Sequence, residues 1–274
     1  MRTVATSGLV IVGLLMLAAC SKAPAPAAPA APGTIVQALK GDPIEGLRVA
    51  KRAGCTGCHM DNGRGGGFDI KSPQGDRVVA PNLTQRRALY DDDALAALLH
   101  EGRTHDGHRA FGMPIFMFQH LSDQEVRDIT AWLRALPAVE NPGLPETTLS
   151  VATAQQLKDG THPYNDDDKP DPGNRPPAVR PTEPLALGRH LALTSCSECH
   201  GRDLNGWGPE DPTPSLLVVN KAYTPENFAR LMRTGMAANG KDTASGFMSA
   251  TARDRFAILT DAEIAALKQY LDSR

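Results

Sequence analysis

The sequence is short of aromatic residues, of net charge and of long apolar runs, and each shortage narrows the classes of protein to consider. Aromatic residues make up only 5% of the 274 residues, so a large core must rely on other apolar groups. The formal net charge of -2 excludes the broad basic surface of a nucleic-acid-binding protein. The apolar run at residues 9–19 is too short to cross a bilayer as a helix.

The first 33 residues predict a leader, an anchor and a spacer rather than part of a fold. The apolar run ends in the letters LAAC, which resemble a bacterial lipobox. We expect residues 1–19 to be a signal peptide, Cys20 to be lipidated, and the Ala- and Pro-rich residues 20–33 to be an extended spacer. The alternative is an ordinary signal peptide with a stray cysteine. The pattern predicts a lipoprotein on the periplasmic side of a bacterial membrane, and Ser21, in place of a retention aspartate, slightly favours the outer membrane.

The five cysteines leave none for a structural disulfide, although an exported protein folds where disulfides form. One of them is Cys20, and the other four lie in two C-x-x-C-H motifs. The first motif contains Cys55, Cys58 and His59, and the second contains Cys196, Cys199 and His200. These four cysteines therefore serve a purpose other than cross-linking the chain.

Two blocks of the sequence, residues 34–140 and 182–274, match each other, and a proline-rich linker or wrapping strap at residues 141–181 separates them. In each block one proline lies twelve residues before the first motif cysteine, where it fits the first turn of a helix. A later proline precedes a glycine by twenty-one residues, and the glycine is expected to end the helix between them. The prolines are Pro43, Pro81, Pro184 and Pro214, and the glycines are Gly102 and Gly235.

The end of each block predicts a capped amphipathic helix. Ser122 with Glu125, and Thr260 with Glu263, form capping-box patterns ahead of apolar residues at helical spacing. Neither block has a convincing strand pattern. We therefore predict an all-α fold of two tandem domains, with three to four helices in each.

Three kinds of site use a pair of cysteines spaced in this way, and the context favours one of them. A zinc site typically needs two such pairs close together, whereas these pairs lie 141 residues apart. A thioredoxin-like redox site needs strands, and none is predicted. Covalent haem attachment explains the whole motif, because both sulfurs can bond haem vinyl groups and the adjacent histidine can bind the iron. We predict two covalently bound haem c groups.

With an entry helix, the motif, a later methionine and a capped C-terminal helix, both blocks resemble class I cytochrome c domains. The resemblance implies that Met113, in the letters GMP, and Met248 bind the second axial face of each iron, opposite the motif histidines. Met117 is the rival ligand in the first block, and packing against the haem is its other possible role. The resemblance also implies that the carbonyls of Pro81 and Pro214 accept hydrogen bonds from the motif histidines.

Other motifs carry weaker indications. His105 and His108 lie near the predicted methionine of the first block and could replace it, although polar loop positions at a haem edge explain them as well. The acidic runs at residues 91–93 and 166–168 lack the ligand spacing of a calcium loop. The glycine-rich residues 60–80 predict a mobile loop or a haem cover. The remaining histidines are expected at the surface or at helix ends: His100, His120, His162 and His190.

Together these features predict a membrane-anchored dihaem c-type cytochrome that carries electrons in the bacterial periplasm. With histidine and methionine on each iron, no position remains open for a substrate, so no catalytic residue is predicted. The expected partners are redox proteins: a dehydrogenase, an oxidase or reductase, or another cytochrome. The alternative is a dihaem enzyme, a peroxidase or a small sulfur-compound dehydrogenase, with one haem open or unusually ligated. A haem-based sensor would need an attached signalling domain, and none is expected.

Overall fold

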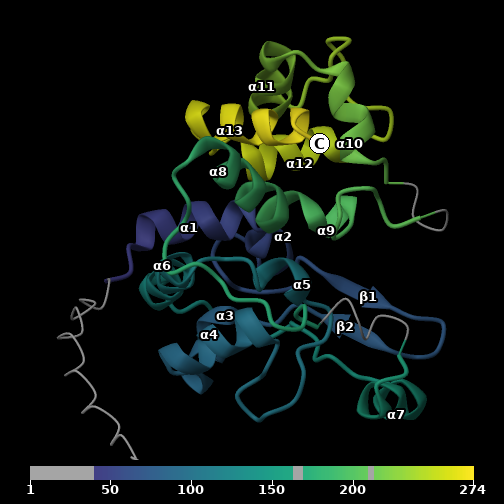
Figure 1. Ribbon diagram of the computed structural model, residues 1–274. Coiled ribbons are helices and arrows are strands. Elements are labelled where there is room, and N and C mark those ends of the chain that lie inside the picture. The colour runs from purple at the N-terminus through teal and green to yellow at the C-terminus, as the bar shows by residue number, and fades with distance from the viewer. Residues whose placement is uncertain (1–39, 163–168, 209–212) are drawn as a thin grey trace, which may run out of the picture. The chain divides into compact units, whose positions relative to one another are not determined.

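The computed structural model describes residues 40–162, 169–208 and 213–274. Figure 1 shows two groups of helices, which we call domain 1, residues 40–140, and domain 2, residues 182–274. We call the residues between them, 141–181, the strap. All described residues belong to one compact unit. The predicted signal peptide, Cys20, the spacer and the acidic run 166–168 lie outside the described residues.

Domain 1 is organised around two long helices, α1 (Pro43–Arg52) and α6 (Asp123–Ala135), which pack against each other. The Asp42 side chain begins α1 by accepting a hydrogen bond of 2.8 Å from the backbone N–H of Ile44. Ser122 and Glu125 form the predicted capping box at the start of α6. The other elements are α2 (Cys55–His59), β1 (Asp69–Lys71), β2 (Arg77–Val79), α3 (Leu83–Arg86), a 3-10 turn (Arg87–Leu89), α4 (Asp92–Glu101) and α5 (Ile115–Phe118).

Domain 2 repeats this arrangement with α8 (Pro184–Leu191) packed against α13 (Asp261–Asp272). The predicted capping box of Thr260 and Glu263 begins α13. The other elements are a π-helical segment η3 (Ala192–Cys196), α9 (Ser197–His200), α10 (Leu216–Val219), a 3-10 turn (Asn220–Ala222), α11 (Pro225–Thr234), α12 (Phe247–Thr251) and a second π-helical segment η5 (Ala252–Phe256).

In both domains the two long helices cross at a glycine. A Cβ atom on Gly46 would lie 1.9 Å from the carbonyl oxygen of Asp128, and one on Gly188 would lie 2.0 Å from that of Ala266. Any larger residue would therefore push the helices apart. Trp132 and Tyr270 lie over these crossings, because their own Cβ atoms are the next neighbours of the two glycines.

The antiparallel pair of β1 and β2 was not expected from the sequence. Asp69 pairs with Val79 and Lys71 with Arg77, within the glycine-rich segment that follows the first motif. All three residues of β1 are exposed, so its sequence has none of the apolar alternation that predicts a half-buried strand. The predicted mobile loop or cover is thus partly a hairpin, while the fold remains mostly helical.

The strap binds along domain 1 and is more than a spacer. Thr148 and Arg77 exchange backbone hydrogen bonds of 2.7 and 2.8 Å, which place the strap beside β2. The backbone N–H of Ser150 donates to Asp76 Oδ1 over 2.7 Å, at the start of α7 (Val151–Asp159). Further along, the N–H of Asp123 donates to the Pro177 carbonyl over 3.0 Å. The strap thus holds both the hairpin and the start of α6.

Each domain has its own buried apolar cluster. In domain 1 the cluster includes Val49, Ile115, Met117, Leu121 and Trp132, and in domain 2 it includes Leu191, Phe228, Leu267 and Tyr270. Within the described residues, no helix has both the length and the apolar character needed to cross a membrane.

Candidate haem sites

The first C-x-x-C-H motif forms a short helix of its own. Gly54, with φ of +84°, turns the chain sharply between α1 and α2, a conformation that glycine adopts without strain. Cys55 and Cys58 then lie one helical turn apart on α2, and no disulfide is found among the described cysteines. Burial raises the pKa of the Cys55 thiol to about 12. Both sulfurs are therefore available as thiols for covalent attachment.

The second motif is reached without a break in the helix. The π-helical segment η3 continues α8 up to Cys196, and α9 carries Cys199 and His200. Burial raises the pKa of the Cys196 thiol to about 12 as well. The two motifs thus contain the same residues, but a sharp turn precedes the first motif and a continuous helix precedes the second.

Both motif histidines are buried and held by a proline carbonyl. Nδ1 of His59 lies 3.0 Å from the oxygen of Pro81, and Nδ1 of His200 lies 2.8 Å from that of Pro214. Because a carbonyl only accepts, Nδ1 carries the proton and Nε2 keeps its lone pair. Burial lowers the pKa of both histidines, which favours the neutral ring that binds metals.

A cavity of about 650 Å³ lies in front of the first motif. Cys55, Cys58, His59 and Pro81 line it, and so does Met113 from the segment before α5. Met117 does not line the cavity, because its side chain is fully buried in the core of domain 1. Apolar walls complete the cavity: Phe68, Val78, Leu95, Leu98, Leu99, Ile129, Trp132 and Leu133.

These residues fit a haem c group. Protein interiors are close-packed, and a hollow of this size is typical of cofactor sites. The donor set also agrees, with two thiols, a neutral imidazole with Nε2 unprotonated and a thioether at one cavity. The chemistry and the space of domain 1 therefore suit the group that the motif predicts.

In domain 2 Met248 is the counterpart of Met113. It lies in the first turn of α12, is half-buried, and packs with Cys196 against the apolar cluster of domain 2. Met232 belongs to the buried part of that cluster, whereas Met236 is exposed at the surface. Of these three methionines, only Met248 lies with Cys196 among the partly buried residues that pack against the cluster.

Two other histidines also line the cavity of domain 1. His105 and His108 lie on the exposed loop that leads to Met113, and the His105 ring meets the Tyr90 ring edge-on at 5.2 Å between centroids. Both positions agree with polar residues at the edge of a haem. The structure leaves them beside Met113 rather than remote from it.

His190 lies in the last turn of α8, which agrees with the helix end expected for it, but it does not lie at the surface. Its side chain is 5% exposed, and Nε2 lies 2.8 Å from Oε2 of Glu125 in the other domain. His100 is half-buried and directs Nε2 to the Leu121 carbonyl at 3.0 Å. The burial of His190 could not be predicted from its neighbours in the sequence, because its partner lies 65 residues away.

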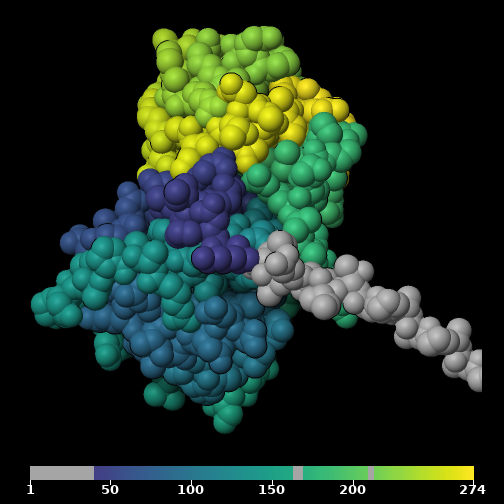
Figure 2. Space-filling model, turned by 90° about the vertical axis from the view of Figure 1, so that its left-hand side faces the viewer, coloured from purple at the N-terminus to yellow at the C-terminus, as the bar shows by residue number. Residues whose placement is uncertain are grey.

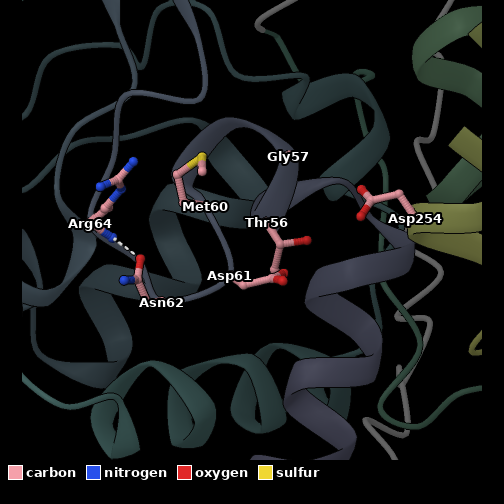
Figure 3. Close-up of a pocket in the computed structure, with 7 residues that line it drawn as sticks. All are labelled: Thr56, Gly57, Met60, Asp61, Asn62, Arg64 and Asp254. Atoms are coloured by element: carbon pink, nitrogen blue, oxygen red, sulfur yellow. Dashed lines mark hydrogen bonds between the residues drawn. The ribbon is translucent and has the colours of Figure 1, made fainter. Parts of the chain in front are cut away.

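A second hollow, of about 550 Å³, lies on another side of α2 (Figure 3). Its lining includes Met60 and the polar residues Thr56, Asp61, Asn62 and Arg64, with Asp254 of domain 2 at one side. No cysteine or histidine lines it, and the described residues contain no cluster of three or more His, Cys, Asp or Glu side chains able to hold a metal. This hollow therefore has neither the cysteine and histidine that attach a haem c nor a cluster of side chains that would hold a metal ion.

The strap was one of the two interpretations of the proline-rich stretch, but the sequence did not predict that it lines the first cavity. Leu144, Pro145, Glu146 and Thr147 line it together with the motif residues. The Thr147 hydroxyl accepts from the Val79 N–H over 3.0 Å and fixes this segment to β2. A proline-rich stretch could have signalled such a cover only in general terms.

Comparison with known proteins agrees with this geometry. The sequence model of the cytochrome c family matches the chain twice, over residues 44–137 and 185–274. A search of curated proteins found no match. The two matched segments contain the two motifs, the crossing helices and both predicted methionines, and the prediction of two tandem cytochrome c domains is confirmed. The chain belongs to the cytochrome c family and carries two domains of it.

Proposed function

We propose that this protein is a dihaem c-type cytochrome that passes electrons between redox partners while anchored to a membrane on its periplasmic side. Haem-based electron transfer follows from membership of the cytochrome c family. The observation that supports two haems is the repeated site: a buried histidine beside two thiols, held by a proline carbonyl, in both domains. The membrane anchor and the periplasmic side are proposed from the lipobox pattern that ends at Cys20.

The protein residues have distinct roles in this proposal. Cys55 and Cys58, and likewise Cys196 and Cys199, would attach the haem, whose iron takes up and releases one electron. The Pro81 and Pro214 carbonyls hold each imidazole by Nδ1, which leaves Nε2 free to bind the haem iron. In domain 1 the apolar walls and the strap cover part of the cavity, which would reduce the rearrangement of solvent when the charge of the haem changes.

Met113 is proposed as the second axial ligand of domain 1 and Met248 as that of domain 2. Met113 lines the cavity, whereas the rival Met117 lies in the core. A thioether ligand favours ferrous iron and raises the reduction potential. With histidine and methionine on both irons, substrates find no open position, which supports an electron carrier over a peroxidase or a sulfur-compound dehydrogenase.

The test is near-infrared spectroscopy of the oxidised protein, scaled to its haem content. We expect two haems per chain and one methionine-sulfur-to-iron band per haem. A single band would leave one iron with another ligand, such as His105, and would favour the dihaem enzyme. That iron would then be assayed with peroxide and with small sulfur compounds.

The anchor is tested separately in a bacterial host. Mass spectrometry of the mature protein should find an acylated N-terminal Cys20 in the membrane fraction. A Cys20→Ser variant should be released as a soluble periplasmic protein with unchanged haem content. Recovery of unmodified chain cleaved elsewhere would reject the lipoprotein assignment while leaving electron transfer intact. Partners would be sought among periplasmic dehydrogenases, terminal oxidases or reductases, and other cytochromes.

A further inference from the structure

Arg255, in η5 of domain 2, lies between the two C-x-x-C-H motifs. Its Nη1 donates to Oε2 of Glu198, inside the second motif, over 2.8 Å. Its Nη2 donates to the carbonyl of Arg52, three residues before Cys55, over 3.3 Å. The arginine side chain is only 11% exposed. One guanidinium therefore holds a segment next to the first motif and a residue of the second.

Gly54 makes this contact possible. A Cβ atom there would lie 2.6 Å from the Arg255 guanidinium, so the cation rests directly on the backbone turn before Cys55. Gly54 thus has two requirements, a positive φ and a face without a side chain. The second requirement comes from domain 2 alone.

Arg52 makes the reciprocal contact from domain 1. Its side chain is buried, and Nη1 donates to the hydroxyls of Thr194 and Ser195 over 2.6 and 3.0 Å. These two residues directly precede Cys196. Nη2 pairs with Glu125 of its own domain, so the buried cation is neutralised. Each motif is therefore held on its N-terminal side by an arginine of the other domain.

The long helices exchange a second pair of contacts. His190, two residues after the crossing glycine Gly188, meets Glu125 of domain 1 at 2.8 Å. Arg48, two residues after the crossing glycine Gly46, meets Glu263 of domain 2 at 2.8 Å. Both glutamates are the third residues of α6 and α13, so the exchange is symmetrical. Figure 2 shows the yellow C-terminal residues directly against the purple residues of α1.

An aromatic contact adds to this interface. The Trp207 ring of domain 2 packs edge-on against Phe116 of domain 1, with 5.3 Å between ring centroids. Its Nε1 donates to the carbonyl of Glu198 over 2.9 Å. Glu198 is thus fixed through its backbone by Trp207 and through its carboxylate by Arg255.

Buried, paired charges of this kind specify geometry more than they add stability, since each ion must leave water. They hold only when their partners lie at the correct distance and angle. The charges also act on the attachment sites: burial raises the pKa of the Cys55 thiol, Arg255 opposes this rise and Glu198 adds to it. Both ions are therefore electrostatically close to the place where a haem edge would bind.

We propose that Arg255, paired with Glu198, is a positioning residue that fixes the two haem groups against each other and sets their potentials, so that an electron passes between them within one chain. The inference rests on the proposed function and deepens it. In this proposal one electron would pass within the chain, so that one haem is oxidised as the other is reduced. No proton or further reactant takes part in this step.

Charge gives the proposal a signature that a purely structural contact lacks. Reduction lowers the positive charge of an iron, so a nearby cation raises the reduction potential and a nearby anion lowers it. Arg255→Gln leaves Glu198 unpaired and should lower both potentials. Glu198→Gln leaves Arg255 unpaired and should raise them. If the contact served only to hold the domains together, the two variants would shift the reduction potentials in the same direction or would leave them unchanged.

The experiment compares Arg255→Gln, Glu198→Gln and the control Arg253→Gln in the full-length dihaem protein. Arg253 lies in the same segment but pairs with Asp242 at the surface of domain 2. Potentials are read by spectroelectrochemical titration, and the transfer rate between haems by flash photoreduction. We expect Arg255→Gln to slow internal transfer at least ~tenfold, since small displacements of reacting groups have effects of this size. Each potential should move by an equilibrium factor of about ten, which corresponds to ~59 mV.

Two results would overturn the proposal. One is an Arg255→Gln protein whose transfer rate and potentials equal those of the Arg253→Gln control. The other is a shift of the same sign in Arg255→Gln and Glu198→Gln. If Arg255→Gln does not accumulate, Glu198→Gln decides alone, and unchanged potentials in it reject the proposal. A wild-type chain without two reducible haems would instead refute the proposed function, which separates the two failures.

Discussion

Domain 1 and domain 2 place the same three residues, two cysteines and a histidine, on a short helix, but they surround them differently. In domain 1 the proline that receives the histidine hydrogen bond follows 22 residues later, and the intervening segment forms a hairpin. In domain 2 that proline follows after only 14 residues. The strap then covers the hairpin side of domain 1, where residues 144–147 line the cavity.

The difference shows how one fold can prepare two sites for different potentials. Excluding water penalises the more highly charged ferric state, so a covered haem is easier to reduce. We therefore expect the haem of domain 1 to have the higher potential. An electron entering at domain 2 would then move downhill to domain 1.

The largest expected effect is the loss of an axial methionine, tested at Met113 and Met248 with the core residue Met117 as control. Met113→Ala and Met248→Ala should each remove one of two methionine-to-iron bands and lower one potential by a sizeable part of the ~0.8 V that axial ligands span. Near-infrared spectra and redox titration measure both. Met117→Ala is the control, because this fully buried residue should lose about 2–5 kcal/mol of stability while both bands persist. Loss of a band in Met117→Ala would reassign the ligand.

The next comparison concerns the two interface glutamates. Glu125 is buried with Arg52 and His190, so Glu125→Gln should destabilise the protein by about 3–5 kcal/mol, since it leaves a buried cation unpaired. Glu263 pairs with Arg48 and Arg180, which are partly exposed, and Glu263→Gln should cost only about 1 kcal/mol. Glutamine can still complete a capping box, so the charge alone is tested. Equal losses in chemical denaturation would contradict this ranking.

The ion pair of Glu125 with Arg52 should make the stability of the protein depend on pH. Burial would raise the pKa of Glu125, but Arg52 and His190 outweigh it and hold that pKa far below its usual value of about 4.5. Because the folded-state pKa is the lower one, the stabilisation is complete above pH ~4.5 and is lost as the pH falls below it. Denaturation between pH 6 and pH 3 should show a steeper loss for wild type than for Glu125→Gln. Parallel curves would argue against the buried pair.

A smaller effect is expected directly after the motif histidines. Met60 and Gly201 share an unusual backbone, with φ and ψ of 65° and 155° and of 80° and 160°, a region that suits glycine. Gly201→Ala should cost about 1–3 kcal/mol, since its Cβ would also meet the Gly206 carbonyl at 2.6 Å. Met60→Gly should change the stability by less than about 1 kcal/mol, because relief of strain offsets the added freedom of the unfolded chain. Thermal denaturation of both variants measures this difference in stability. A large loss of stability in Met60→Gly would contradict it.

The smallest expected effect concerns the attachment of the strap. Asp76 accepts hydrogen bonds from the Ser150 N–H and from the hydroxyls of Ser72 and Thr153, which lower its pKa to about 2. Asp76→Asn should loosen the strap and speed its cleavage by a protease, and acid should do the same in wild type as the pH falls from about 4 towards 2. Asp159→Asn, at the exposed end of α7, is the control and should be cleaved at the wild-type rate.

Local features of the fold could be predicted from the sequence, because their causes lie within a few residues. The capping boxes at Ser122 and Thr260 and the helix ends at Gly102 and Gly235 are of this kind. The hydrogen bonds from His59 and His200 to the proline carbonyls were expected through the family resemblance rather than from local chemistry.

The contacts between the domains could not be predicted in this way. Arg52 and Thr194 are 142 residues apart, and nothing near either residue identifies the other. His190 carries no sign of burial on its own helix, because an amphipathic pattern cannot distinguish a domain interface from solvent. The hairpin was missed for a different reason, since its exposed residues form no alternating pattern.

The strap also bears on the order in which the protein is assembled. The lid of the first site consists of residues 144–147, which follow domain 1 in the chain. Chains are synthesised from their N-terminus onward and their domains generally fold in that order, so we expect domain 1 to form first with its cavity open on that side. That interval is when a bulky group can reach Cys55 and Cys58. When Thr147 and Thr148 bind to β2, the strap covers this side of the cavity. The strap would then keep the attached group in place after the cysteines have reacted.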